Sequence, residues 1–149
     1  MTELEIRLGV RIRRMTPEDY DQALALWVGC SGLRLRSAED SRAGISAFLW
    51  RNAETCFVAE TMGTVVGTIL AGNDGRRGYL YHLAVDETCR RRGLGSELVR
   101  RATKALRRVG IRKTALVVLA ENPEGNDFWE HIGFSARRDL VYRDRQLIS

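Results

Sequence analysis

The chain has 149 residues, the usual length of one domain, and we expect residues 1–149 to form a single domain. Hydrophobic residues make up 44% and charged residues 29%, with a net charge of +5, a balance typical of globular rather than disordered or fibrous proteins. The longest apolar run, Ala115–Ala120, falls well short of the roughly 20 residues of a membrane span, and the acidic N-terminus is atypical of a secretory signal, so we expect neither.

The first half of the chain predicts a strand, two helices and three further strands. Residues 4–13 alternate apolar and charged side chains, which is the period of a strand. A helix then begins at Thr16-Pro17, where a capping residue precedes a proline, and it buries Trp27. A second helix covers Ala38–Arg51. The three β-prone runs that follow, separated by turns that contain glycine, are Phe57–Glu60, Thr64–Ala71 and Tyr79–Val85.

The second half of the chain alternates helices with strands. Apolar residues recur at helical spacing over residues 94–109, and Gly110 ends that helix as a left-handed cap. The near-continuous apolar run Lys113–Ala120 predicts a strand buried on both faces. A short helix over Pro123–Ile132 and two short strands within Phe134–Gln146 complete the chain.

This order of elements predicts an α/β (α+β) fold. The helix that separates Tyr79–Val85 from Lys113–Ala120 requires these two strands to be parallel, because a crossover connection joins parallel neighbours. The earlier, hairpin-linked strands are antiparallel. We therefore expect a mixed, mostly antiparallel central sheet of six to seven strands with helices on both faces.

The basic residues are almost all arginine, since only Lys104 and Lys113 are lysines. Two explanations stay open: codon usage in a GC-rich genome, or phosphate binding, for which the forked guanidinium is the better ligand. A nucleic-acid-binding module would use the arginines as a phosphate-binding stripe. That reading is disfavoured because the 24 basic residues are mixed with 19 acidic ones and no aromatic platform accompanies them.

The three cysteines, Cys30, Cys56 and Cys89, are an odd number and widely spaced. They form no Cys-x-x-Cys pair, and no pair of histidines lies near them in the sequence. This pattern argues against a disulfide framework and against a zinc site, so we expect no metal and a cytoplasmic protein.

The strongest functional signal lies in the stretch His82–Val99. A strand ends near Val85, three arginines follow at positions 90–92, and Gly93-Leu94-Gly95 then begins a helix. A helix N-terminus presents backbone N–H groups and the positive end of the helix dipole, and glycines let a ligand approach the backbone. We predict a phosphate or pyrophosphate site. It is not a nucleoside triphosphatase loop, which needs Gly-Lys-Ser/Thr, nor a dinucleotide fingerprint, which needs glycine in place of Leu98.

Two motifs together resemble those of the GNAT superfamily of N-acetyltransferases. Arg90-x-x-Gly93-x-Gly95 resembles the family's Arg/Gln-x-x-Gly-x-Gly/Ala signature, and Asn122–Phe134 resembles its Asn-x-x-Ala-x-x-Leu-Tyr-x-x-x-Gly-Phe block. The resemblance extends over about Val10–Leu147 and is strongest to small bacterial members of the YpeA type. It implies the acyl-CoA N-acyltransferase (GNAT) fold, acetyl-CoA as co-substrate, and direct attack of a primary amine on the thioester. The amine would belong to a small molecule, a protein N-terminus or a lysine.

The resemblance also implies roles for individual residues. The backbone amides over residues 91–96 would hold the CoA pyrophosphate, with the three arginines adding positive charge. The main chain at the end of the preceding strand would hold the pantetheine arm and polarise the thioester carbonyl, and Asn122 would contact the same arm. The implied cofactor-binding residues are Leu83, Ala84, Val85, Arg90, Arg91, Arg92, Gly93, Leu94, Gly95, Ser96, Asn122 and Trp129.

The chain departs from the family at Trp129, where the family commonly has the tyrosine that protonates the departing thiolate. An indole N–H donates a hydrogen bond but is no practical acid at neutral pH. Three alternatives stay open. Another tyrosine (Tyr79, Tyr81 or Tyr142) is the catalytic acid; or the thiolate leaves unprotonated, since a thiol pKa is only about 8.5; or the chain is a CoA-binding sensor or accessory domain with little catalysis.

The general base is also unassigned at this level. The glutamate that many family members carry in the central strand would fall near Tyr79, so a water relay is expected in its place. Alternation in that strand predicts that His82 lies on the opposite face to Tyr81, packed under a helix and not acting as a base. The resemblance further allows a homodimer that forms through the last strands.

Overall fold

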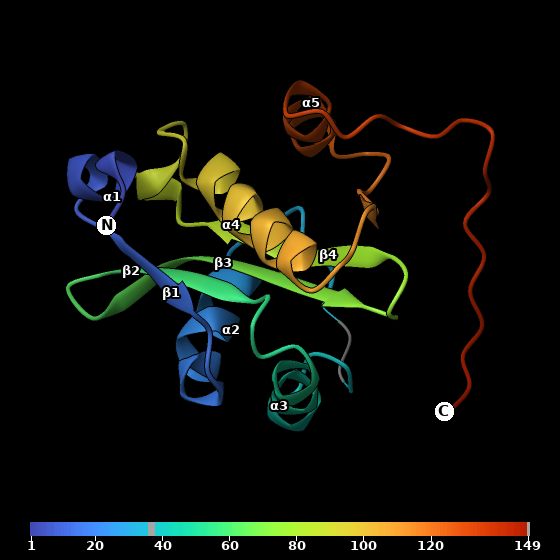
Figure 1. The fold of residues 1–149 in the computed structure, drawn as a ribbon, viewed down its shortest axis with the longest axis horizontal. Helices are drawn as coiled ribbons and strands as arrows, with labels where there is room; N and C mark the ends of the chain where they lie inside the picture. The colour runs from blue at the N-terminus through green and yellow to red at the C-terminus, as the bar shows by residue number, and fades with distance from the viewer. Residues whose placement is uncertain (36–37, 149) are drawn as a thin grey trace. The chain divides into compact units, whose positions relative to one another are not determined.

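The computed structural model describes residues 1–35 and 38–148 (Figure 1). They form two compact units, Met1–Val117 and Val118–Ser149. The first unit holds a five-stranded sheet with the strand order β1-β2-β3-β4-β5. The second holds the helix α5 (Pro123–His131).

The sheet is mixed and mostly antiparallel, as predicted. Strands β1 to β4 pair antiparallel in succession, and β5 pairs parallel to β4. A two-residue turn with positive φ at both Met62 and Gly63 joins β2 to β3, the backbone that suits a tight hairpin. The strands are β1 (Arg11–Arg14), β2 (Phe57–Thr61), β3 (Thr64–Asn73), β4 (Gly78–Val85) and β5 (Thr114–Ala115).

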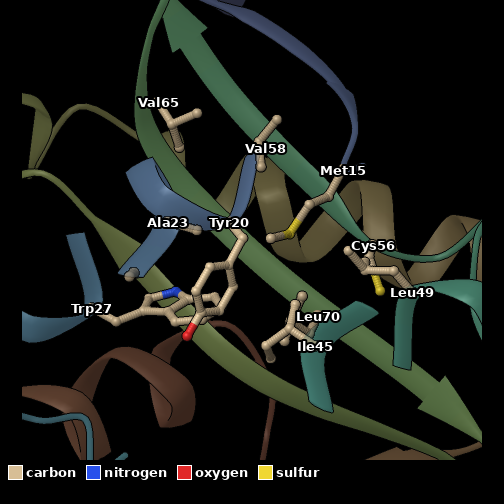
Figure 2. Packing of buried hydrophobic residues seen from close by; sticks show 11 residues of the cluster. Met15, Tyr20, Ala23, Trp27, Ile45, Leu49, Cys56, Val58, Val65 and Leu70 are labelled. Carbon is tan, nitrogen blue, oxygen red and sulfur yellow. The ribbon is translucent and has the colours of Figure 1, made fainter. Parts of the chain in front are cut away.

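One face of the sheet is covered by α2 (Tyr20–Val28) and α3 (Arg42–Arg51), which follow the short 3-10 helix η1 (Pro17–Asp19). Trp27 belongs to this core and has no exposed surface, which confirms the predicted anchor. Figure 2 shows how side chains from both helices and from the strands meet there. The buried cluster comprises Met15, Tyr20, Ala23, Trp27, Ile45, Leu49, Cys56, Val58, Val65, Leu70 and Ala84.

The opposite face is covered by α4 (Leu94–Arg108), so helices lie on both faces of the sheet as predicted (Figure 1). The apolar side of α4 is buried and its charged side is exposed, as expected for an amphipathic helix on a sheet. Its buried residues are Leu94, Leu98, Val99, Ala102, Ala105 and Leu106.

The prediction of a strand over residues 4–13 is wrong in its first half, where the helix α1 (Glu3–Leu8) forms. Thr2 and Glu5 make a capping box: the Thr2 hydroxyl accepts from the Glu5 N–H at 3.2 Å, and the Glu5 carboxylate accepts from the Thr2 N–H at 2.6 Å. Gly9, with φ of 67°, ends the helix in the left-handed conformation. The alternation survives only in β1.

Glu5 is buried, with 3% exposed surface, and it ties α1 to the rest of the first unit. Its carboxylate accepts from the Ile12 N–H at 2.8 Å and from Arg101 of α4 at 3.0 Å. Burial is the largest single effect and opposes the charged form, but the hydrogen bonds from Thr2 and Ile12 and the charge of Arg101 together outweigh it and lower the pKa of Glu5.

The predicted count of six to seven strands is also wrong. The strand expected over Lys113–Ala120 is only β5, and none of the described residues within Phe134–Gln146 joins a ladder. Apolar residues there, such as Leu140 and Val141, are 62% and 76% exposed, so this stretch has no buried face. A period-two pattern forms a strand only when a neighbouring strand pairs with it. In the described part of the chain, no helix has the length and apolar character needed to cross a membrane.

Candidate active site

Strand β4 carries a β-bulge at His82 and Leu83. Thr68 of β3 pairs with Ala84, and Leu70 pairs with Tyr81, so two β4 residues lie opposite the single residue Ile69. His82 has a positive φ of 49°, which is uncommon for a residue other than glycine. A bulge breaks the ladder and redirects side chains, and such bulges are over-represented next to active sites.

The buried side chain of Thr68 holds the bulge in place. Its hydroxyl accepts a hydrogen bond from the Trp27 indole N–H at 2.8 Å and donates one to the His82 carbonyl at 2.8 Å. The carbonyl on the bulge therefore has a partner although the strand ladder is interrupted. One side chain links helix α2, strand β3 and the distorted part of β4.

The prediction that His82 and Tyr81 lie on opposite faces is wrong, because the bulge breaks the alternation. The Tyr81 ring packs edge-on against Phe48 of α3, at 5.7 Å between ring centroids. The His82 ring packs edge-on against Trp27 of α2, at 4.6 Å. Both side chains thus lie on the face that α2 and α3 cover. The His82 Nε2 also lies 2.5 Å from the Asp40 Oδ1, and both side chains are almost buried, with 12% and 11% exposed surface.

The outer edge of β4 opens beside the bulge. Within the described residues, the parallel ladder between β4 and β5 pairs Gly78 with Thr114 and Tyr79 with Ala115 and extends no further. Beyond Tyr79, β4 continues through the bulge to Val85. An extended ligand that carries amide groups can pair with the backbone there as an additional strand would. Leu83, Ala84 and Val85, the predicted pantetheine-binding residues, lie on this part of β4.

The loop after β4 leads into the N-terminus of α4 through a second strained turn. Asp86 begins the 3-10 helix η2 (Glu87–Cys89), accepting from the N–H and the hydroxyl of Thr88. Arg91 and Gly93 then have φ of 62° and 90°, and Gly93 is the N-cap of α4. In the described part of the chain, no side chain caps this helix. Its first N–H groups are therefore available to an anion at the positive end of the dipole.

The three arginines of this loop have different roles. The Arg90 Nε donates to the Val85 carbonyl at 3.0 Å, so this side chain ties the loop back to the end of β4. Arg91 and Arg92 are exposed beside the helix N-terminus. The predicted cradle is thus one continuous loop and helix start, which runs from Arg90 through Leu94 and Gly95 to Ser96. Its residues fit a pyrophosphate in charge and in backbone geometry.

Helix α1 packs against the cradle, which the sequence analysis missed. The Arg7 guanidinium donates to the Arg92 carbonyl at 3.4 Å, and a Cβ on Gly93 would lie 3.2 Å from the Leu4 side chain. The Thr2-x-x-Glu5 capping box and Gly9 were the signals that could have predicted this helix.

Of the three candidate acids, Tyr79 and Tyr81 lie together on β4. Their rings are 4.7 Å apart at an angle of 35°, and Tyr81 is 42% exposed. Tyr142 is 65% exposed and belongs to the second unit. The structure brings the first two together beside the bulge, and the role of each of the three stays a prediction.

The second unit contains the other predicted ligands of CoA. The Asn122 side chain caps α5 by accepting from the Gly125 N–H at 3.0 Å. A Cβ on Gly125 would collide with the Asn122 side-chain nitrogen, so in this chain the glycine leaves room for the cap in its present conformation. Trp129 packs edge-on against Phe128 and Phe134, at 5.1 Å from each. The contacts of Asn122 and Trp129 with CoA stay predictions.

No cluster of three or more histidine, cysteine, aspartate or glutamate side chains within the described residues could hold a metal ion. The described cysteines are free thiols.

Comparison with known proteins identifies the family. The profile of the Acetyltransferase (GNAT) family matches residues 21–134. An acetyltransferase of Photorhabdus laumondii is 36% identical over 118 residues, covering 79% of this chain and 78% of that protein. An acetyltransferase of Sodalis glossinidius is 30% identical over 139 residues, covering 93% and 96%. The chain therefore belongs to the GNAT acetyltransferase family.

Solved structures agree on the fold. Ard1 from Thermoplasma volcanium superposes with a TM-score of 0.75 at 24% identity, covering 85% of this chain and 83% of that one. The PaiA N-acetyltransferase from Thermoplasma acidophilum, solved in complex with coenzyme A, gives 0.74 at 18% identity, covering 86% and 91%. With the family established, the chain is an N-acetyltransferase whose co-substrate is acetyl-CoA.

Proposed function

We propose that this N-acetyltransferase acetylates a primary amine, on a small molecule, a protein N-terminus or a lysine, at the bulge of β4. The observation that carries the proposal is the position of the bulge, on a strand whose outer edge is open and which leads directly into the uncapped N-terminus of α4. The pyrophosphate of CoA would bind the N–H groups over residues 91–96. The pantetheine arm would run along β4 past Leu83, Ala84 and Val85.

In this arrangement the amine attacks the thioester carbonyl carbon directly. A backbone N–H at the bulge, such as that of Leu83, donates to the carbonyl oxygen as it becomes an oxyanion, and one such donor is worth about 10²–10³ in rate. The tetrahedral intermediate then expels the CoA thiolate. Tyr81, beside the bulge and partly exposed, is our candidate for the acid that protonates it.

The alternative is a CoA-binding sensor or accessory domain with little catalysis, which Trp129 favours. A turnover assay separates the two: acetyl-CoA is mixed with a panel of amines, and release of the CoA thiol is followed together with the mass of the acetylated product. The panel contains an alkylamine, a polyamine, an aminoglycoside and peptides that present a lysine or an α-amine. Catalytic acetylation of any member supports the enzyme, and binding of CoA without acetylation of any member supports the sensor.

Two further properties belong to this proposal. The free thiols of Cys30, Cys56 and Cys89 support a cytoplasmic location, where such thiols stay reduced. The family resemblance supports a homodimer, which light scattering after gel filtration tests directly. A monomeric mass at micromolar concentration would contradict the dimer.

A further inference from the structure

The pair formed by His82 and Asp40 lies beside the proposed reaction centre. His82 is one of the two bulged residues of β4, and Asp40 comes from the segment between α2 and α3, 42 residues earlier in the chain. Their side chains meet at 2.5 Å and are both almost buried. A buried carboxylate costs several kcal/mol unless it is paired, so this contact is a specific feature of the fold.

Among the described residues, the His82 ring contacts one carboxylate, that of Asp40. Trp27 of α2 packs edge-on against the ring, but its N–H is already bonded to Thr68 of β3. Tyr20 of α2 donates its hydroxyl hydrogen to the Asp40 carbonyl at 2.7 Å and so positions the segment that carries the carboxylate. Of the residues that the structure describes, Asp40 is thus the charged group in contact with the His82 ring, and the side chains of Trp27 and Thr68 are uncharged. The nearby Arg42 of α3 lies over the Tyr20 ring, 4.9 Å from its centroid, and pairs with Asp21.

This arrangement prepares a histidine to accept a proton. A carboxylate at Nε2 holds the ring hydrogen on that nitrogen, so the neutral ring has its lone pair on Nδ1. The same carboxylate stabilises the imidazolium that forms when Nδ1 takes up a proton. The positive φ of His82 is a strained conformation for a non-glycine residue, and such strain clusters at active sites.

We propose that His82 is the general base of the reaction and that Asp40 is its positioning residue. This inference rests on the proposed function, and it replaces the water relay expected from the sequence. An alkylamine with a pKa near 10.4 arrives as an ammonium at neutral pH and cannot attack until it loses a proton.

The amine loses two protons and gains one C–N bond during the transfer. The ammonium gives one proton to the His82 Nδ1, and the nitrogen lone pair forms the C–N bond to the thioester carbon. The C–S bond breaks, and the sulfur leaves with the electron pair. The Tyr81 hydroxyl gives its proton to that sulfur, which yields the CoA thiol, and takes up the second proton, which the new amide nitrogen sheds. The imidazolium then releases its proton to water.

The test compares His82→Gln with Asp40→Asn and with His131→Gln, which removes the other histidine of the chain at an exposed position on α5. CoA binding by calorimetry first establishes that each variant keeps the donor site. Acetylation is then measured on the amine from the panel that the wild type acetylates fastest. We expect His82→Gln to lower kcat by 10²–10⁴-fold with little change in the KM for acetyl-CoA, Asp40→Asn to lower it less, and His131→Gln to match the wild type.

The pH profile separates a base from a merely structural residue. The deficit of His82→Gln shrinks as the pH rises toward the pKa of the amine, because the amine then arrives already deprotonated. A wild-type rate in His82→Gln, or a deficit that is equal at every pH, overturns this inference and leaves the proposed function standing. Failure of the wild type to acetylate any amine overturns both. If His82→Gln loses CoA binding, Asp40→Asn takes its place in the test. A wild-type rate in Asp40→Asn, or a deficit that is equal at every pH, then overturns the inference.

Discussion

Thr68→Val tests whether one buried hydroxyl holds the bulge. Valine has nearly the same shape as threonine, so the change removes two hydrogen bonds without creating a cavity. The indole N–H of Trp27 and the carbonyl of His82 then lose their partners in a site where Thr68 and Trp27 have no exposed surface. Each of these two buried polar groups costs about 1–3 kcal/mol when left without a partner, so we expect a loss of about 2–6 kcal/mol in the free energy of unfolding.

The assay is equilibrium unfolding in urea, followed by tryptophan fluorescence and by circular dichroism. Thr64→Val is the matched control, because it makes the same substitution at an exposed position of the same strand. The control is expected to stay within about 0.5 kcal/mol of the wild type. A Thr68→Val protein that also stays within this range would refute the reasoning, since both hydrogen bonds would then be dispensable. We also expect Thr68→Val to lower acetyl transfer, because the position of His82 depends on the bulge.

Two further predictions concern Glu5 and Tyr81. Because its pKa is lowered in the folded chain, Glu5 contributes stability above its ordinary pKa of 4.5, and this contribution is lost as the pH falls through the lower, folded value. Urea unfolding between pH 3 and pH 7 should therefore show a weaker pH dependence in Glu5→Gln than in the wild type, and Glu3→Gln, at an exposed position of the same helix, should not differ from the wild type. If Tyr81 is the acid, Tyr81→Phe lowers kcat about 10²-fold or more while Tyr79→Phe does not; equal rates in all three proteins would exclude both tyrosines and leave Tyr142 or an unprotonated thiolate.

The parts of the fold that the sequence predicted well depend on local signals. The hairpins around β3 follow from their turn residues, and α4 follows from a long apolar period that ends at Gly110. The phosphate cradle was predictable for the same reason, since its arginines, its glycines and the helix start are adjacent in the chain. Family motifs then extended this local prediction to an acetyl donor.

The errors arise where two local patterns compete or where the answer is not local. Residues 4–8 fit an alternating strand as well as a short helix, and the capping box of Thr2 with Glu5 decides for the helix. The bulge at His82 cannot be seen in a pattern that assumes unbroken alternation, so the prediction of the sheet face on which that side chain lies was wrong. The contact with Asp40 joins residues 42 positions apart and has no sequence signal.

Acetyl transfer at β4 requires above all that the N-terminus of α4 holds the pyrophosphate of CoA. Calorimetry of CoA and acetyl-CoA in moderate salt, with adenosine monophosphate as the weak-binding control, tests it on the wild type, Gly93→Glu and Gly75→Glu. Both glycines have φ of 90°, so the two variants share the backbone strain, but Gly75 lies in the turn before β4. We expect Gly75→Glu to bind CoA as the wild type does and Gly93→Glu to bind at least tenfold more weakly, a loss of about 1.4 kcal/mol or more. Wild-type affinity in Gly93→Glu would contradict the central claim.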